Sequence, residues 1–210
     1  MPADQRGKVK NAMCYDPAAG SGTLLMALAH AIGERNCSIW SGTFREVVEP
    51  AAPGSGAEQA GAQYPQHHPG QHHPAPGAQD RSALKQFDYI VSNPPFKMDF
   101  GDFRDQLETD ANATRFFAGI EGAEQGQDKM AIYLLFIQHI MASKPGGKAA
   151  VVVPTGFITA ASGIELRIRQ KLVEEKMIAG VVSMPSIFAY PRHQRVRSCS
   201  WTAPRTAAWC

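Results

Sequence analysis

Two short stretches of the 210-residue chain combine residue types that could do chemistry together. The first is a turn of small residues that follows an aspartate. It consists of Asp16, Pro17, Ala18, Ala19, Gly20, Ser21 and Gly22. Glycines let a backbone approach a ligand closely, and a helix that starts after such a turn offers free N–H groups. The turn is therefore a candidate cofactor site. A nicotinamide dinucleotide is disfavoured, because the third glycine of that fingerprint is absent near Leu25.

The second stretch has the composition needed to hold a planar amine. It consists of Ser92, Asn93, Pro94, Pro95 and Phe96. The Asn93 side-chain oxygen and the Pro94 carbonyl can both accept hydrogen bonds from an exocyclic –NH2 group. The two prolines hold the backbone rigid, and Phe96 offers a face on which a flipped base could stack. Taken alone, either stretch could be only a tight structural turn. Occurring together in this order, they favour a functional site.

Alternating strands and helices must position these two turns. Apolar runs and helical spacing predict strands over residues 12–15, 37–40, 87–91, 149–153 and 177–183, and helices over residues 23–32, 128–141 and 163–176. Strands that alternate with helices form βαβ units, so we expect an α/β fold with a mostly parallel sheet and helices on both faces. Both candidate turns then follow strands, at the edge where such sheets bind ligands. Asp88 is expected to have a structural role at the start of its strand.

Two segments differ from this pattern. Residues 42–80 contain no Leu, Ile or Met, and 28 of the 39 are Gly, Pro, Ala, His or Gln. Such a segment buries little, so we expect it to be disordered or loosely packed. The pairs His67-His68 and His72-His73 within it are not expected to bind metal. The last 19 residues carry four arginines and no acidic residue, and no regular element is expected there.

The bulk composition is that of a globular protein, with 44% hydrophobic and 19% charged residues. A formal net charge of +2 implies that any contact with nucleic acid is local or shared with another subunit. Four scattered cysteines argue against a zinc site and a disulfide framework, and no segment offers eighteen apolar residues. We expect a cytoplasmic protein without a membrane contact.

The pair DPAAGSG and SNPPF resembles the cofactor and catalytic motifs of N6-adenine DNA methyltransferases. Residues 128–131, 146–154 and 182–188 are further similar to the modification subunit of type I restriction–modification systems. The resemblance covers roughly residues 11–41 and 83–191. It implies a Rossmann-like methyltransferase fold, S-adenosylmethionine as methyl donor and DNA adenine as acceptor, with no metal. It also implies partners, namely DNA and the specificity and restriction subunits.

The resemblance implies a role for each motif. Asp16, Pro17, Ala18, Gly20, Ser21 and Gly22 would bind the cofactor. Asn93, Pro94, Pro95 and Phe96 would form the catalytic turn, with Phe96 stacking on the extruded base. Asn93 and the Pro94 carbonyl would orient the adenine amine for in-line transfer of the methyl group. Catalysis would then be mainly positioning and electrostatics.

The sequence also departs from the family. The acidic residue that binds the cofactor ribose should follow the second strand, but Ser41 and Gly42 stand there. Its loss would remove charge-assisted hydrogen bonds of about 1.5–3 kcal/mol. The family also implies a further apolar strand near the end of the chain, where Pro191 instead opens the basic segment. A missing strand would leave an unpaired sheet edge.

These departures suggest four parts of the chain. Residues 1–41 and 81–191 form two parts of an incomplete methyltransferase domain, and residues 42–80 and 192–210 interrupt and follow them. Our hypothesis is that the latter two are translated in the wrong reading frame, and a natural insertion with a shortened C-terminus is the alternative. Sequencing the gene tests this. If a shifted frame restores no family-like sequence, the hypothesis is wrong.

Two other functions stay open at this point. A similar Asn-Pro-Pro-aromatic motif on a similar fold methylates protein glutamine amides, although the type I-like sequence after Asp128 argues against that activity. A remnant that binds no cofactor and only holds partner subunits is the second alternative, and the composition of residues 42–80 favours it.

Overall fold

The computed structural model describes residues 9–42, 47, 85–101, 104, 107–121, 131–143, 147–184 and 196–202. Within these residues the chain forms one six-stranded sheet in the order β2-β1-β3-β4-β6-β5. The strands are β1 (Ala12–Asp16), β2 (Cys37–Ser41), β3 (Tyr89–Ser92), β4 (Lys148–Pro154), β5 (Ile178–Ser183) and β6 (Val196–Thr202). Strands β2, β1, β3 and β4 are parallel, whereas β6 runs antiparallel to both of its neighbours.

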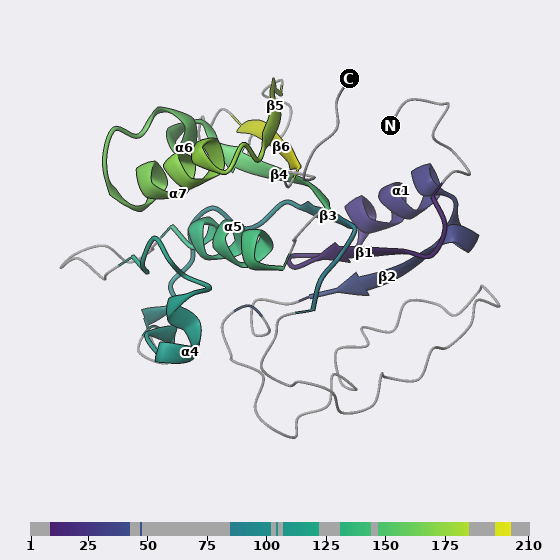
Figure 1. Ribbon diagram of the computed structural model, residues 1–210, viewed down its shortest axis with the longest axis horizontal. Helices are drawn as coiled ribbons and strands as arrows, with labels where there is room; N and C mark the ends of the chain where they lie inside the picture. The colour runs from purple at the N-terminus through teal and green to yellow at the C-terminus, as the bar shows by residue number, and fades with distance from the viewer. Residues whose placement is uncertain are drawn as a thin grey trace.

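The helices connect these strands (Figure 1). They are α1 (Thr23–Ile32), the 3-10 turn η2 (Glu34–Asn36), α4 (Asp110–Ala113), α5 (Tyr133–Ala142), α6 (Thr155–Thr159) and α7 (Gly163–Glu174). Helices α1 and α7 begin at the predicted residues, whereas α5 begins at Tyr133 and the preceding Ala131 and Ile132 are not helical, so the predicted start at residue 128 is too early. The α/β architecture with a mostly parallel sheet is confirmed. Residues 48–80 with both histidine pairs lie outside the described residues.

Alternate residues of β1 point to opposite faces of the sheet. Ala12 and Cys14 pack with Leu25 and Ile32 of α1 on one face. Tyr15 points to the other face and joins a cluster with α5 and α7. That cluster also includes Ile90, Leu134, Ile137, Ala149, Val151, Val153, Ile168 and Leu172. Helices therefore cover both faces, as the sequence predicts.

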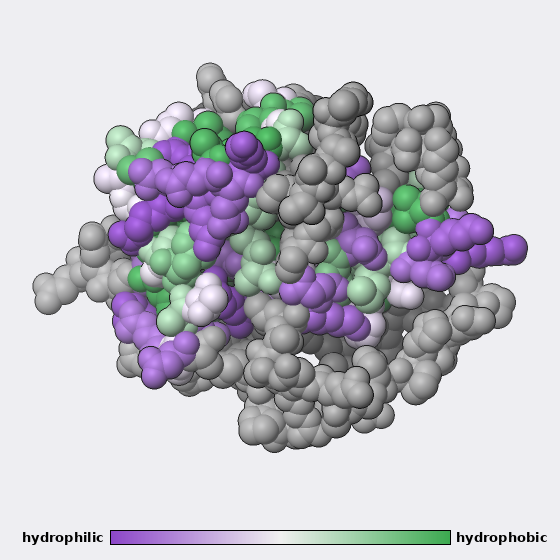
Figure 2. Space-filling model, viewed as in Figure 1, coloured by the Kyte–Doolittle hydropathy of each residue, from purple (hydrophilic) through white to green (hydrophobic). Residues whose placement is uncertain are grey.

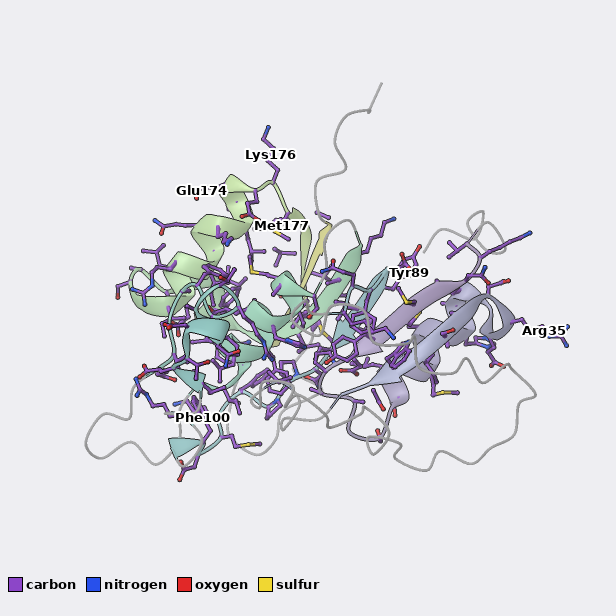
Figure 3. The ribbon with its side chains drawn as sticks, turned by 60° about the horizontal axis from the view of Figure 1, so that its bottom comes forward. Arg35, Tyr89, Phe100, Glu174, Lys176 and Met177 are labelled. Carbon is purple, nitrogen blue, oxygen red and sulfur yellow. The ribbon has the colours of Figure 1, made fainter. Side chains whose placement is uncertain are left out.

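A third cluster lies on the far side of α5. Phe100, Leu107 and Phe116 come from the segment after β3, and they pack against Ile132, Leu135 and Phe136. Phe100, a member of this cluster, is labelled at the lower left of Figure 3. Because α5 packs on both sides, eight of its ten residues are buried, including the polar Gln138 and His139, and its amphipathic pattern is weak.

The expectation of no regular element after residue 192 is wrong for residues 196–202. Val196–Thr202 forms β6, which lies between β4 and β5 and pairs with both along its length. Its amides and carbonyls find partners on two sides, which stabilises a strand even where the sequence has no apolar run. Within the described sheet, β6 therefore pairs with the edge of β4 that faces away from β3.

Strand β5 forms an edge of the described sheet, and every one of its residues is exposed. Ile178, Val181 and Val182 are its exposed apolar residues. Figure 2 shows hydrophobic surface at the top of the molecule, where β5 lies in Figure 1. At the start of β5 the chain turns sharply at Lys176, whose side chain points outward, while Met177 is buried (Figure 3).

Candidate active site

The first candidate turn connects β1 to α1. Gly20 and Gly22 have φ values of 50° and 75°, in the left-handed region that favours glycine. The N–H of Gly22 donates to the carbonyl oxygen of Ala19 at 2.6 Å, which closes the turn. Helix α1 has no side-chain cap and no acidic residue in its first turn. Its first N–H groups are therefore available to an acceptor from outside the helix.

Asp16 is the last residue of β1 and is buried, with 1% of its surface exposed. Its Oδ1 accepts a hydrogen bond from the N–H of Ala18 at 2.9 Å, so the carboxyl shapes the turn that follows it. Burial raises the pKa of Asp16 to about 6, while the Ala18 N–H and the Ser92 hydroxyl act to lower it. Pro17 and Gly22 are also buried, whereas Gly20 and Ser21 are exposed and Ala18 is half-buried.

The second candidate turn follows β3. Asn93 is exposed and makes no hydrogen bond with another described residue. Pro94 is buried and Pro95 is exposed. Phe96 is half-buried against the cluster beneath the sheet, and its ring meets Tyr133 edge-on at 6.3 Å between centroids. Asn93 therefore presents its side chain at the surface, whereas Phe96 packs against the core.

The sheet brings the two turns together. Strands β1 and β3 are adjacent and parallel, with Tyr15 beside Ile90 in the register. The chain moves from β1 outward to β2, and from β3 in the opposite direction to β4. The boundary between β1 and β3 is therefore a topological switch point, where open α/β sheets bind ligands beyond the carboxyl ends of the strands. Asp16 and Asn93 stand on the two sides of that boundary.

The start of β3 is fixed to β1 by Asp88. Its Oδ2 accepts a hydrogen bond from the N–H of Met13 at 2.8 Å, and its own N–H donates to the Met13 carbonyl at 2.9 Å. The structural role expected for Asp88 is confirmed. This pairing supports the register in which Cys14 lies beside Tyr89 and Tyr15 beside Ile90.

Polar residues that the sequence did not single out lie beneath the site. The Tyr15 hydroxyl is 3.1 Å from Nε2 of His139, which is 5% exposed. Burial, together with the nearby Arg115 guanidinium, lowers the pKa of His139 to about 3. Arg115 is also buried and donates to the carbonyl oxygen of Val47. These residues are 24 to 124 positions apart in the chain, and no local pattern in the sequence joins them.

The end of β2 lies beside the end of β1. After β2, the N–H of Gly42 donates to the Asp16 carbonyl at 2.8 Å, and neither Ser41 nor Gly42 supplies a carboxylate. Among the described residues, no three His, Cys, Asp or Glu side chains gather in a way that could hold a metal ion. None of the described helices is long and apolar enough to cross a membrane.

The fold is that of S-adenosylmethionine-dependent methyltransferases. The chain aligns over 98% of its length with 42% of the type I restriction–modification methyltransferase subunit from Streptococcus thermophilus, with a TM-score of 0.61 and 15% identity. It also aligns over 96% of its length with 57% of a class I S-adenosylmethionine-dependent methyltransferase structure from Listeria monocytogenes, with a TM-score of 0.53 and 19% identity.

Residues 64–201, more than half of the chain, match the family described as N-6 DNA Methylase, and the chain belongs to that family. It is also 29% identical over 109 residues to the type I restriction enzyme MjaIX methylase subunit of Methanocaldococcus jannaschii. That alignment covers 50% of this chain and 18% of the relative, so the chain spans less than a fifth of that protein. The family match includes the Asn93 turn but not residues 16–22.

Proposed function

We propose that this chain carries the methyl-transfer site of an adenine-specific DNA methyltransferase, as the modification subunit of a type I restriction–modification system. The observation that supports it most is the placement of two turns at one switch point. The Asp16–Gly22 turn follows β1, and the Asn93–Phe96 turn follows the adjacent parallel strand β3. In this proposal the first turn binds S-adenosylmethionine and the second binds the target adenine.

The cofactor turn suits a ligand with a polar, hydrogen-bond-accepting part. Left-handed Gly20 exposes backbone without a side chain, and α1 starts without a side-chain cap after the left-handed Gly22, which leaves its first N–H groups for a ligand. S-adenosylmethionine, when bound, supplies an activated methyl group on a positively charged sulfur. The residues of the turn bind and orient it. The ribose carboxylate that the family resemblance implies is not among Ser41 and Gly42, which would weaken this binding.

The catalytic turn would present acceptors to an amine. The exposed Asn93 side-chain oxygen and the Pro94 carbonyl can each accept one N–H of the adenine amino group. With both protons held, Asn93 and Pro94 would orient the amine for methylation by the cofactor. The excess proton of the amine would pass to water, so these residues need not supply a strong general base. Phe96, packed against Tyr133, would support the extruded base.

The partners follow from the same assignment. A net charge of +2 leaves little general attraction for DNA, so a separate specificity subunit would supply most of the DNA contact, and a restriction subunit would complete the assembly. The methylase subunit from Methanocaldococcus jannaschii supports this role. The match to an N-6 DNA methylase family favours DNA over a protein glutamine as the methyl acceptor.

Calorimetric titration of the purified chain with S-adenosylmethionine tests the cofactor site. Transfer of a labelled methyl group to DNA in the presence of a type I specificity subunit tests the reaction, with Asn93→Ala as the variant. We expect micromolar cofactor binding by both proteins and methyl transfer by the wild type alone. A folded chain that binds no cofactor would contradict the proposal and favour a remnant without catalysis.

A further inference from the structure

We infer that Tyr133 is a positioning residue, which fixes the tilt of the Phe96 ring and so sets the angle at which the extruded base is held. The inference rests on the function proposed above for the Asn93–Phe96 turn. Tyr133 is the first residue of α5 and is 5% exposed. Its ring contacts Phe96, in the turn after β3, and Phe157, in the helix α6 after β4. The three rings form an aromatic row.

The contacts within the aromatic row are nearly perpendicular. The ring centroids of Phe96 and Tyr133 are 6.3 Å apart, and their planes meet at 81°. Those of Tyr133 and Phe157 are 6.1 Å apart, and their planes meet at 87°. Both pairs have the edge-to-face arrangement that aromatic rings favour, because the positive edge of one ring meets the negative face of the other. A tilted ring loses this arrangement, so each contact constrains the orientation of a ring as well as its position.

Burial decreases along the aromatic row toward the proposed base site. Phe157 is 1% exposed and belongs to the same buried cluster as Tyr133, whereas Phe96 is half-buried and packs against that cluster from outside. Phe157 and Tyr133 are therefore fixed by close packing with their neighbours. Phe96 is the member with surface left for a ligand. The rigid part of the row thus lies in the core, and its accessible end lies in the turn that would receive the base.

The orientation of Phe96 needs a constraint from outside its own turn. Pro94 and Pro95 restrict the backbone that leads to Phe96, but two side-chain torsions still set the direction of its ring. Tyr133 supplies that constraint from a different element, the start of α5. Strands β3 and β4 are adjacent and parallel, so the row also joins the segments that follow two neighbouring strands.

The tilt of Phe96 matters for the reaction proposed above. A base that stacks on Phe96 takes its plane from that ring, and this plane sets where the amino group lies relative to the Asn93 oxygen and the Pro94 carbonyl. A displacement of about 1 Å at the reacting atoms can lower the rate by about a hundredfold. Tyr133 touches neither base nor cofactor in this scheme and acts through Phe96. Its hydroxyl contributes little, because it reaches Glu165 only at 3.5 Å.

The first measurement uses the chain alone. NMR of protein with labelled phenylalanine and tyrosine rings follows the contact between Phe96 and the ring at position 133, with Phe96→Leu for assignment. We expect nuclear Overhauser contacts between the two rings in the wild type and in Tyr133→Phe. In Tyr133→Leu, the Phe96 signals should shift, because the neighbouring ring is lost. A wild type without contacts between the two rings would overturn the inference.

The second measurement is the single-turnover rate of methyl transfer, with a type I specificity subunit and saturating DNA and S-adenosylmethionine. Tyr133→Leu should lower this rate about ten- to a hundredfold, whereas Tyr133→Phe, which keeps the ring, should stay within about twofold of the wild type. Leu172→Ala is the control for lost stability, because Leu172 is 2% exposed in the same core but lies on α7, outside the row. It should leave the rate unchanged. A wild-type rate in Tyr133→Leu, or an equal loss in Leu172→Ala, would contradict the positioning role.

A double-mutant cycle with Phe96→Leu decides whether Tyr133 acts through Phe96. In the Phe96→Leu background, adding Tyr133→Leu should lower the rate little further, because the ring to be positioned is already gone. An equal loss in both backgrounds would show that Tyr133 acts by another route. If Tyr133→Leu does not fold, Tyr133→Met takes its place, since methionine fills an irregular core space without an aromatic ring, and the same results are expected.

Failure of this inference can be distinguished from failure of the proposed function. A wild-type chain that binds no cofactor, or transfers no methyl group, would contradict the proposed function. The ring contacts seen by NMR, and the coupling between the two substitutions in urea denaturation, need neither cofactor nor DNA. They would still decide whether Tyr133 fixes the Phe96 ring.

Discussion

The Tyr15 hydroxyl lies 3.1 Å from Nε2 of His139, and this contact joins β1 to α5 inside the core. The Tyr15 ring also stacks on Phe87 at 4.3 Å between centroids. Tyr15 precedes Asp16, so the contact supports the strand end that carries the cofactor turn. Removing one partner of a buried hydrogen bond leaves the other unsatisfied.

Tyr15→Phe keeps the stacked ring and removes the hydroxyl. We expect the free energy of unfolding to fall by about 1–3 kcal/mol, measured by urea denaturation with an unchanged m value. Tyr133→Phe is the matched control, since its hydroxyl reaches Glu165 only at 3.5 Å and in a partly buried place, and it should cost less. Equal losses in the two variants would contradict a special role for the Tyr15 contact.

Stability should depend on pH through two buried groups that act in opposite directions. The pKa of Asp16 is raised from 3.8 to about 6, so its contribution to stability is present below pH 3.8 and is lost as the pH rises through 6. The pKa of His139 is lowered from 6.5 to about 3, so its contribution is present above pH 6.5 and is lost as the pH falls toward 3. Between about pH 4 and 6 the two effects partly cancel.

Single variants should separate the contributions of Asp16 and His139 to the pH dependence of the free energy of unfolding. In Asp16→Asn, the opposing contribution of Asp16 is removed and that of His139 remains. The free energy of unfolding should therefore rise more steeply with pH between about pH 4 and 6 than in the wild type. In His139→Gln, the Asp16 term remains, and stability should fall over the same range. Urea denaturation at several pH values measures both. Parallel pH profiles for the two variants would show that these groups do not set the pH dependence.

The chain passes very close to itself at Gly147, directly before β4. A Cβ atom there would lie 2.4 Å from the Phe87 carbonyl oxygen and 2.7 Å from that of Asp88. Gly147→Ala must displace backbone, and we expect a loss of about 1–3 kcal/mol or more in thermal or urea unfolding. Gly156→Ala is the control, because nothing lies within 4 Å of a Cβ atom there and the residue is helical. It should be neutral or slightly stabilising. A Gly147→Ala variant as stable as the wild type would show that the backbone segments at residues 87–88 and 147 can move apart at little cost.

The cofactor turn has its own conformational requirement. Gly22 caps α1 with φ 75°, a conformation that costs an L residue roughly 1–2 kcal/mol. Gly22→Ala should tilt the first turn of α1 and weaken S-adenosylmethionine binding about tenfold or more in calorimetry. Gly180→Ala, in open space on β5, should leave binding unchanged. Wild-type affinity in Gly22→Ala would argue against cofactor binding at this turn.

The regular elements near the site were predictable because their signals are local. The apolar run before Asp16 predicts β1, and the helix-forming residues after Gly22 predict α1 with the bounds found in the structure. The roles of Asp16 and Asn93 stay predictions. Their proximity follows from the order of the strands, which the sequence suggests only through the alternation of strands and helices.

The remaining features depend on contacts that no local pattern reports. Ser92 stands in the quoted motif, yet nothing in the sequence shows that its side chain is buried. The pairing of Tyr15 with His139 spans 124 positions. Strand β6 has no apolar run, and it forms because strands on both sides supply hydrogen bonds. The reading-frame hypothesis for residues 42–80 and 192–210 stays a prediction.

The position of β6 has a consequence for the order of synthesis. Strand β5 leaves the ribosome before β6, yet in the described sheet β5 pairs only with β6, and β6 separates it from β4. Ile178–Ser183, with its exposed valines, therefore has no strand to pair with in this sheet until Val196–Thr202 has been synthesised. A chain that ends between these two strands would leave one edge of β4 unpaired and β5 without a partner, and such unpaired strands favour aggregation.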